Sequence, residues 1–302
     1  MTHSFLQSLT ILAALMIAIP GAAIPSAAQS RIDCGAMNSK ILRHPVRYCV
    51  YLPGSYDAVK TPPQEYPVLY YLHGLGGNEQ QLFSDGGWTM LDELRRKHKI
   101  GEFLIAAPDA AKTFYINSVD GKIRYSDFFV QEFIPYIEGK YHVSRQRTGR
   151  AITGISMGGF GALRFAFSHP ELFVAVSAQS PALTTESPKE IVVSMQSDPS
   201  RAKLMAEIFG DPINLPHWRE NDPLVLAREN AVALRRLAIY FNCGEEDDYG
   251  FEEGAAALNE ELKKEKVKHE YRSYPGDHSA EYFTSHFDEV IEFHSRTFGL
   301  KP

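Results

Sequence analysis

The pentapeptide Gly-Ile-Ser-Met-Gly at residues 154–158 constrains the fold of this 302-residue chain more than any other segment. It stands between a β-branched apolar run and a helix-forming stretch of small and apolar residues. A serine on so sharp a strand-to-helix turn has a strained main chain, so the residues two before and two after it must lack a clashing Cβ atom. Gly154 and Gly158 meet this need. The segment therefore predicts a nucleophile elbow with Ser156 at its tip.

The rest of the chain alternates short β-branched or aromatic runs with longer stretches of helical period. This alternation is typical of an α/β protein with a mostly parallel central sheet flanked by helices. We expect strands at residues 47–52, 68–72, 103–107, 151–155, 173–178, 237–242 and 270–274, and helices at residues 88–98, 127–138, 160–167, 254–265 and 281–296.

A proline-rich region at about residues 184–232 interrupts this alternation between two strands. We expect a helical excursion there. An insertion of this length at the functional edge of a sheet favours a cap or pocket wall, and an ordinary surface decoration is an equal alternative.

The first 28 residues differ from the remainder, with an apolar run at residues 9–19 and small residues up to Ala28. This pattern predicts a secretory signal peptide at residues 1–28 and a catalytic domain at residues 29–302 that is secreted or periplasmic. The alternative is an uncleaved membrane anchor, although the run is shorter than the ~20 residues that a span requires. We expect no membrane contact after cleavage.

Export would allow the cysteines to form disulfides, because these bonds persist in oxidising compartments. Cys34 and Cys49 lie on either side of a turn-like segment at residues 37–40, so antiparallel pairing would bring them together. We predict that they form a disulfide. Cys243 follows an apolar run at the end of an expected strand, which favours a buried, inert thiol.

Composition narrows the classes of ligand. The chain is 44% hydrophobic and 23% charged, as in globular proteins with a substantial core. Its net charge of −6 without a basic cluster argues against a nucleic-acid partner. No metal-binding motif is found in the sequence, and we expect neither a metal nor another cofactor.

Two later loops supply partners for Ser156, because a serine hydroxyl needs a base and the base needs an orienting carboxylate. His278 follows the expected strand at 270–274, where functional groups of a parallel sheet collect. The loop after residues 237–242 offers Glu246, Asp247 and Asp248 as candidate acids. The order serine, acid, histidine is that of an α/β-hydrolase. The alternatives are a helix-capping serine and a structural loop histidine.

The glycine-rich loop at residues 73–78 follows a third expected strand. Such a histidine-glycine loop places a main-chain amide beside the amide that follows the nucleophile, where both stabilise a developing oxyanion. We assign the amides of Leu75 and Met157 to this oxyanion hole. A tight glycine turn without a catalytic part is the alternative, and a phosphate loop is excluded because the Gly-Lys-Ser/Thr ending is missing.

Several motifs resemble those of a known family, the esterase D-like group of α/β-hydrolases. They are YCVYLP at residues 48–53, LHGLGG at 72–77, GISMGGFGAL at 154–163, and the loops with Gly244, Asp247 and His278. The group includes S-formylglutathione hydrolases, bacterial feruloyl and acetyl-xylan esterases, and mycolyltransferase antigens. The resemblance covers roughly residues 45–300 and implies acyl hydrolysis or transfer through an acyl-serine. It also implies Asp247 as the acid, because the acid in that family commonly stands three residues after a glycine.

The resemblance leaves the substrate open. The formylglutathione enzymes act in the cytosol, whereas an export signal favours a small-molecule or polysaccharide-linked ester, such as a feruloyl or acetyl ester. Acyl transfer to a sugar alcohol and S-formylglutathione hydrolysis remain alternatives. A non-catalytic relative is disfavoured, because the whole catalytic set is present. The expected substrate pocket contains His73, Phe114, Tyr115, Trp218, Tyr249 and Tyr282.

Overall fold

The computed structural model describes residues 29–59, 61, 63–187, 190, 191, 193 and 198–301. The expected signal peptide at residues 1–28 lies outside these ranges. A single sheet with strand order β1-β2-β4-β3-β5-β6-β7-β8 runs through the described residues. Strands β3 to β8 are parallel where they pair, and β2 is antiparallel to both of its neighbours. The strands are β1 Arg31–Asn38, β2 Pro45–Leu52, β3 Val68–Leu72, β4 Leu104–Pro108, β5 Arg150–Ile155, β6 Ala175–Gln179, β7 Ala238–Gly244 and β8 Glu270–Tyr274.

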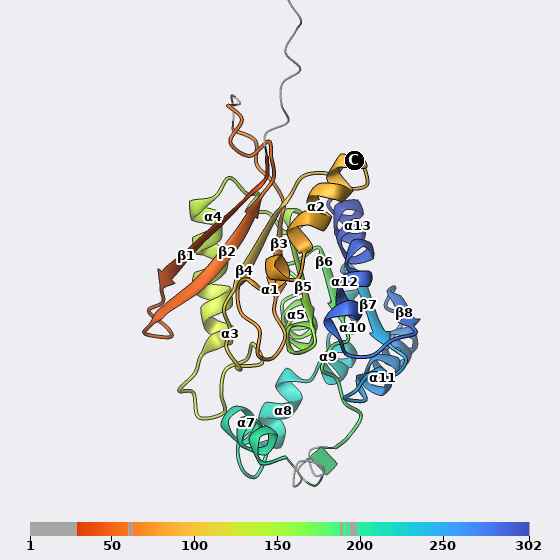
Figure 1. Cartoon of the computed structure of the whole chain (residues 1–302). Helices are drawn as coiled ribbons and strands as arrows, with labels where there is room; N and C mark the ends of the chain where they lie inside the picture. The colour runs from red at the N-terminus through yellow and green to blue at the C-terminus, as the bar shows by residue number, and fades with distance from the viewer. Residues whose placement is uncertain are drawn as a thin grey trace, which may run out of the picture.

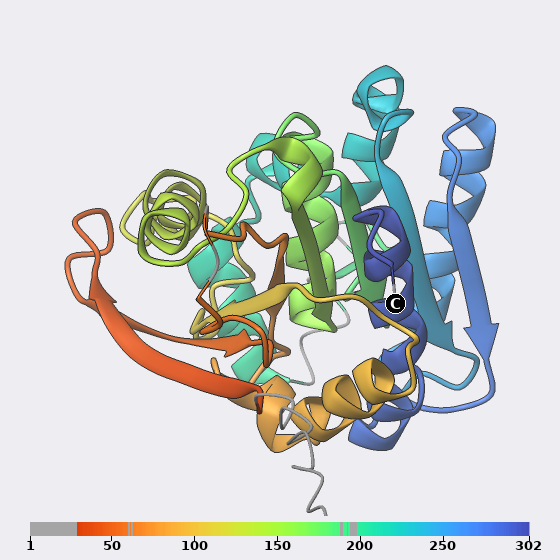
Figure 2. The ribbon, with the colours of Figure 1, turned by 90° about the horizontal axis from the view of Figure 1, so that it is seen from above.

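Helices cover both faces of this sheet (Figures 1 and 2). Figure 2 shows α2 and α13 on one face and α4, α5 and α11 on the other. The helices are α1 Gln81–Ser84, α2 Gly87–Arg96, α3 Tyr125–Phe128, the π-helix η1 Phe129–Phe133, α4 Ile134–Lys140, the 3-10 helix η2 Arg147–Gly149, α5 Met157–Ser168, α7 Pro199–Phe209, α8 Leu215–Asn221, α9 Pro223–Glu229, α10 Ala231–Leu234, α11 Phe251–Lys264, α12 Ala280–Ser285 and α13 Phe287–Thr297.

The hydrophobic core is divided by the sheet into two layers. One layer packs α3, η1, α5 and α11 against the strands, and the other packs α2 and α13 against the opposite face. Strands β3, β4 and β6 are buried along their whole length, as expected for parallel strands covered on both faces. The predicted mostly parallel sheet flanked by helices is therefore confirmed.

Some element boundaries differ from the sequence-based expectation. Strand β1 was not among the expected strands. Helix α5 begins at Met157 rather than at residue 160, because the helix starts directly after the elbow serine. The expected helix at 281–296 is divided at His286, whose ring stacks on Tyr274 with 4.1 Å between ring centroids.

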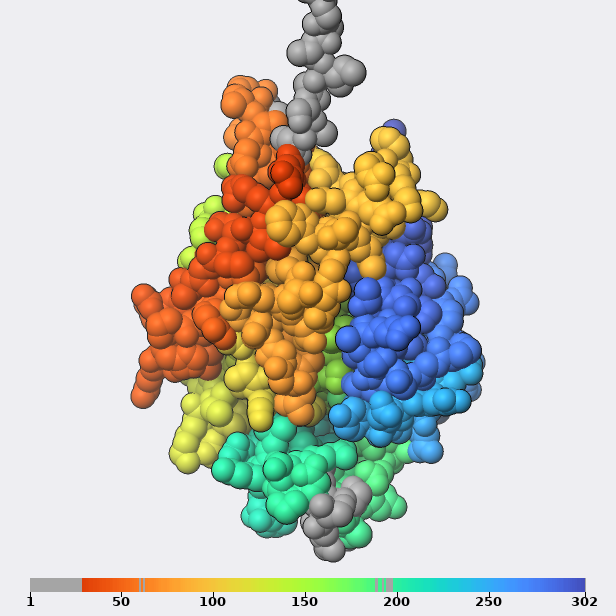
Figure 3. Space-filling view, in the orientation of Figure 1, coloured from red at the N-terminus to blue at the C-terminus, as the bar shows by residue number. Residues whose placement is uncertain are grey.

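The region at 184–232 is helical as predicted, with α7, α8 and α9 and the first residues of α10 among its described residues. Helices α7 and α8 lie beyond the carboxyl ends of the parallel strands, at the lower side of Figure 1. In the space-filling view the same teal segment covers this end of the molecule (Figure 3). We call α7 and α8 the cap helices because of this position, and their contribution to a pocket wall stays a prediction. Within the described ranges, no helix combines the length and the apolar character that a membrane crossing requires.

The predicted disulfide between Cys34 and Cys49 is present. The two residues lie opposite each other in the antiparallel pair β1–β2. Cys243 is a free, buried cysteine, as expected. The disulfide therefore ties β1, which forms one edge of the sheet, to β2.

Replacing both Cys34 and Cys49 with alanine should lower the free energy of unfolding by about 3 kcal/mol, because the bond closes a short loop in the unfolded chain. The loop joins residues 15 positions apart. Urea unfolding of the oxidised wild type and of the double variant measures the difference. Reduction of the wild type should reproduce it, and equal stabilities would show that the bond adds nothing.

Candidate active site

The turn at Ser156 has the strained geometry predicted for a nucleophile elbow. Its φ of 53° and ψ of −119° fall in a region that side-chain-bearing residues rarely adopt. A Cβ atom on Gly154 would overlap the main chain of Gly158, and one on Gly158 would overlap the carbonyl of Leu72. Both glycines are therefore required by the close approach of α5 to β5 and β3.

The structure brings Ser156, Asp247 and His278 together, although they come from the ends of three different strands. The Nε2 atom of His278 lies 2.9 Å from the Ser156 Oγ atom, and its Nδ1 atom lies 2.7 Å from an Asp247 carboxylate oxygen. A carboxylate accepts hydrogen bonds, so Nδ1 carries the ring proton and Nε2 is left to accept the serine proton. The arrangement has the hydrogen-bond geometry of an activated nucleophile.

The Asp247 carboxylate is buried, yet it is surrounded by donors. Its second oxygen accepts the Tyr249 amide at 3.1 Å, and the Cys243 thiol lies 3.6 Å from the oxygen that faces His278. Burial raises the pKa of Asp247, but the hydrogen bonds from His278 and the Tyr249 amide outweigh it and hold the pKa below its usual value. Burial raises the pKa of Cys243 to about 12, so the thiol keeps its proton.

The two other candidate acids do not contact the His278 ring. The Asp248 carboxylate accepts the main-chain amide of His278 at 3.3 Å, and Glu246 donates its own amide to the Gly276 carbonyl at 3.0 Å. Both contacts join the loop after β7 to the loop after β8. The sequence did not reveal that Asp248 binds the main chain of His278. Nothing in the sequence distinguishes a carboxylate that faces the ring from one that faces the main chain.

The glycine-rich loop after β3 lies beside the nucleophile. A Cβ atom on Gly74 would stand 3.5 Å from the Ser156 Cβ atom. The Gly77 amide donates to the Gly74 carbonyl at 3.0 Å and closes a tight turn. The Leu75 amide has no main-chain acceptor among the described residues. Met157 is the first residue of α5, so its amide has no acceptor within the helix. Two free donors thus lie near Ser156.

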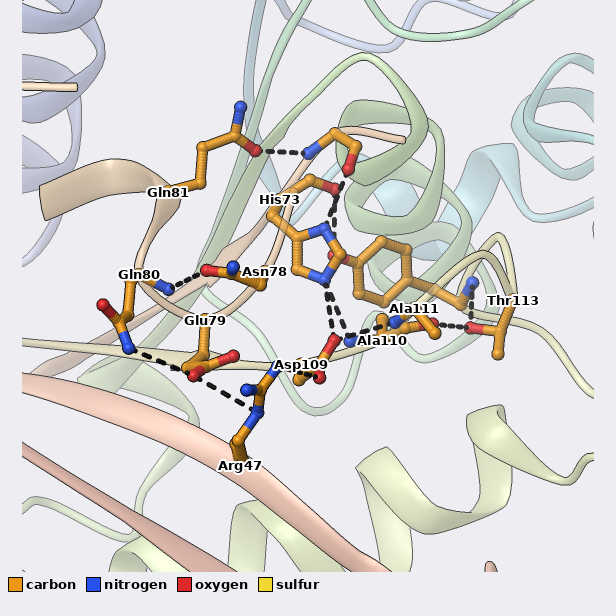
Figure 4. A network of polar contacts seen from close by, with 12 residues as sticks. Arg47, His73, Asn78, Glu79, Gln80, Gln81, Asp109, Ala110, Ala111 and Thr113 are labelled. Carbon is orange, nitrogen blue, oxygen red and sulfur yellow. Dashed lines mark hydrogen bonds and ion pairs between the residues drawn. The ribbon is translucent and has the colours of Figure 1, made fainter. Parts of the chain in front are cut away.

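Three of the expected pocket residues are buried. The exposed fractions of His73, Tyr115 and Tyr282 are 1%, 0% and 4%. The Tyr115 hydroxyl donates to the His73 carbonyl at 3.0 Å, and the Tyr282 hydroxyl lies 3.3 Å from Asn242. Figure 4 shows the His73 ring enclosed by its polar partners. These side chains are packed inside the protein, so the prediction that they line the substrate pocket is wrong.

The other expected pocket aromatics lie closer to the surface. Tyr249 is 62% exposed, and its ring stands edge-on to His278 at 4.9 Å. Phe114 packs against Phe160, one turn into α5, and Trp218 packs against Phe209 within the cap.

Sequence reasoning missed two further rings around His278. Phe251 and Phe283 both stand edge-on to the imidazole, at 5.3 Å and 5.2 Å between ring centroids. Each lies within five residues of a predicted triad member, and this closeness in sequence could have identified them.

A narrow cleft runs between the segment at residues 82–90 and the helices α12 and α13. Figure 3 shows this gap between the orange and blue segments, with green atoms at its base. Ile155 and Gln179 line the cleft next to the elbow. Its volume of about 20 Å³ has room for about one water molecule, so it does not hold an acyl group in this conformation. In the described part of the chain, no group of three or more His, Cys, Asp or Glu side chains could hold a metal ion.

Comparisons with known proteins agree with this geometry. Residues 39–294 match the model of the family described as esterase. An acetyl esterase of Caldicellulosiruptor saccharolyticus is 24% identical over 229 residues, which cover 76% of this chain and 83% of that protein.

Solved structures give the same picture. A ferulic acid esterase is similar with a TM-score of 0.76 and 27% identity, covering 90% of this chain and 99% of the other. An S-formylglutathione hydrolase of Agrobacterium tumefaciens shares the fold, with a TM-score of 0.71 and 21% identity over 91% of this chain and 98% of the other.

Replacing Asp247 with asparagine should lower turnover of an ester substrate by several orders of magnitude, because the ring of His278 would then adopt the wrong tautomer. The loss is about 10⁴ in the serine protease that serves as the worked example of this triad. Asp248→Asn is the matched control, and we expect a much smaller loss because Asp248 contacts only the main chain of His278. Steady-state kinetics of both variants measure this. The reverse order of effects would show that Asp248 is the acid.

Proposed function

Because the chain belongs to the esterase family and is a serine esterase with the α/β-hydrolase fold, we propose that it cleaves carboxylic esters through an acyl-enzyme on Ser156. In this proposal His278 is the general base and acid, and Asp247 orients it. The observation that carries the proposal is the unbroken chain of hydrogen bonds from Asp247 through His278 to Ser156.

In the first half-reaction, His278 Nε2 accepts the Ser156 hydroxyl proton while Oγ attacks the carbonyl carbon of the ester. The carbonyl electron pair moves to the oxygen, where the Leu75 and Met157 amides stabilise the negative charge. The intermediate then collapses and the bond to the alcohol oxygen breaks. His278 gives its proton to the departing alcohol, and the acyl group remains on Ser156.

In the second half-reaction, water takes the place of the alcohol. His278 accepts a proton from this water as its oxygen attacks the acyl carbon. The bond to Ser156 Oγ then breaks, and Oγ recovers the proton from His278. The carboxylic acid leaves and the enzyme returns to its starting state. A sugar hydroxyl in place of water would give acyl transfer by the same steps.

We propose a carbohydrate or aromatic ester as the substrate, such as a feruloyl or acetyl ester. The acetyl esterase and the ferulic acid esterase to which the chain is similar support this class. Two exposed apolar side chains also support it, because Leu75 on the glycine-rich loop is 49% exposed and Tyr249 beside His278 is 62% exposed. Exposed apolar surface at a catalytic site favours contact with an apolar or aromatic group.

We propose further that the protein acts outside the cytoplasm, with residues 29–302 as its mature catalytic domain. The disulfide between Cys34 and Cys49 supports this compartment, because such bonds persist in oxidising environments. The apolar leader at residues 1–28 supports it as well.

Replacing Ser156 with alanine should abolish covalent labelling by a fluorophosphonate and reduce ester hydrolysis to near background, because the attacking atom is removed. Intact-mass spectrometry of the labelled wild type and variant measures the loss. Ser84→Ala, which removes the hydroxyl of an exposed serine, is the control and should leave labelling unchanged. Labelling of the Ser156 variant would exclude Ser156 as the nucleophile.

An ester panel tests the substrate class. We expect methyl ferulate or acetylated xylan to give a higher kcat/KM than S-formylglutathione, with short p-nitrophenyl esters as a general reference. Mass spectrometry of reactions with an added sugar alcohol detects acyl transfer. A preference for S-formylglutathione would overturn the proposed substrate, and a dominant transfer product would identify an acyltransferase.

A further inference from the structure

We propose that His73 is a positioning residue that aims the Leu75 amide at the reacting carbonyl oxygen. This inference rests on the proposed function, in which that amide is a donor of the oxyanion hole. His73 precedes the glycine-rich loop and is 1% exposed, so it does not touch the substrate. Its effect on the reaction would pass through the main chain of Gly74 and Leu75.

The His73 ring is held by two main-chain partners. Its Nδ1 atom lies 2.8 Å from the Gly74 carbonyl oxygen, and its Nε2 atom lies 2.9 Å from the Ala110 amide nitrogen (Figure 4). A carbonyl only accepts a hydrogen bond and an amide only donates one. The two main-chain contacts are therefore satisfied together by the tautomer with its proton on Nδ1. An Asp109 carboxylate oxygen also faces Nε2, but at 3.7 Å it lies beyond hydrogen-bond distance.

The hydrogen bond from His73 fixes the direction of the Leu75 amide. The Gly74 carbonyl and the Leu75 amide belong to one planar trans peptide, so they point in opposite directions. The carbonyl is held by His73 on one side and by the Gly77 amide at 3.0 Å. The Leu75 N–H group consequently points away from His73. Its peptide lies beside Ser156, because a Cβ atom on Gly74 would stand 3.5 Å from the Ser156 Cβ atom.

The far side of the ring is anchored to the sheet. Asp109, which precedes Ala110, donates its amide to the Arg47 carbonyl at 2.9 Å, continuing the pairing of β2 with β4. The Asp109 carboxylate also accepts the Ala111 amide at 3.0 Å and the Arg47 guanidinium at 3.1 Å. The Ala110 amide is therefore fixed relative to the strands. His73 links this fixed amide to the Gly74 carbonyl.

Glycine makes this link necessary. Gly74 carries no Cβ atom, so rotation about its ψ angle, which turns the peptide between Gly74 and Leu75, is little restricted. A half-turn of that peptide would direct the carbonyl oxygen, rather than the N–H group, at the developing oxyanion. The hydrogen bond from His73 Nδ1 opposes such a rotation.

Two substitutions distinguish the role of the Nδ1 donor from that of the Nε2 acceptor. His73→Asn keeps a donor near the position of Nδ1, and His73→Gln keeps an acceptor near the position of Nε2 while losing that donor. We expect His73→Gln to lower kcat by about 10- to 100-fold. This loss is at most about as large as that caused by removing one oxyanion-hole donor. KM should change by less than about twofold. His73→Asn should retain kcat within about threefold of the wild type.

A transition-state analogue distinguishes positioning from a general structural role. An aryl trifluoromethyl ketone adds to the serine and places an oxyanion in the hole, so its affinity for His73→Gln should fall in proportion to kcat. His294→Gln is the matched control. His294 is also fully buried and bonds Ser177 at 2.8 Å, but it lies on α13, away from the catalytic loops. It should lose thermal stability while its kcat and its affinity for the ketone stay unchanged.

Equal kcat values for His73→Gln and the wild type would overturn the inference, as would equal losses in His73→Gln and His73→Asn. If neither variant folds, neutron diffraction from the unmutated enzyme locates the ring proton. A proton on Nε2 would overturn the inference, and a proton on Nδ1 would support it. The proposed function fails separately, if Ser156→Ala keeps its activity and its labelling.

Discussion

The close packing of α5 against β3 is the contact on which the catalytic geometry depends. Gly158 stands so near the Leu72 carbonyl that no side chain fits between them. This approach forces the turn at Ser156 into its strained conformation and also brings the glycine-rich loop beside the nucleophile. The strain is held by hydrogen bonds on both sides of the serine, since its amide donates to Gln179 and its carbonyl accepts the Ala182 amide. Packing and these hydrogen bonds thus stabilise a main-chain conformation of Ser156 that would be unfavourable in isolation.

A buried carboxylate has to stay ionised if it is to stabilise the imidazolium that forms during the reaction. Asp247 meets this need because His278, the Tyr249 amide and the Cys243 thiol all direct hydrogen atoms at it. The thiol is a weak donor, and its raised pKa keeps it neutral beside the carboxylate. The ring of His278 is enclosed by Tyr249, Phe251 and Phe283, which limit its rotation and shield the hydrogen bond from water.

Most features predicted from sequence are set by local chain geometry, whereas the partners of Ser156 were predicted from their places after expected strands. The elbow at Ser156 is encoded in five consecutive residues, and the disulfide follows from two cysteines that flank one hairpin. Several features set by distant side-chain contacts were missed. His73 and Tyr115 were placed in the pocket because the sequence gives their proximity to the loop but not the side of the loop on which they lie. The break at His286, whose ring stacks on Tyr274 at the end of β8, was also missed.

The parallel sheet separates the chemistry from the choice of substrate. The glycine-rich loop and the proposed nucleophile, acid and base follow β3, β5, β7 and β8, whose spacing is fixed by their hydrogen bonds. The loops after β7 and β8 are further joined through Glu245 and Glu246, which bond Tyr274 and Gly276. The cap helices α7 and α8 lie outside this framework (Figure 1). Because the sheet and not the cap fixes these loops, a change in α7 or α8 should leave the proposed catalytic groups in place. His73 belongs to the same framework, so in our proposal it acts on the reaction without contacting the substrate.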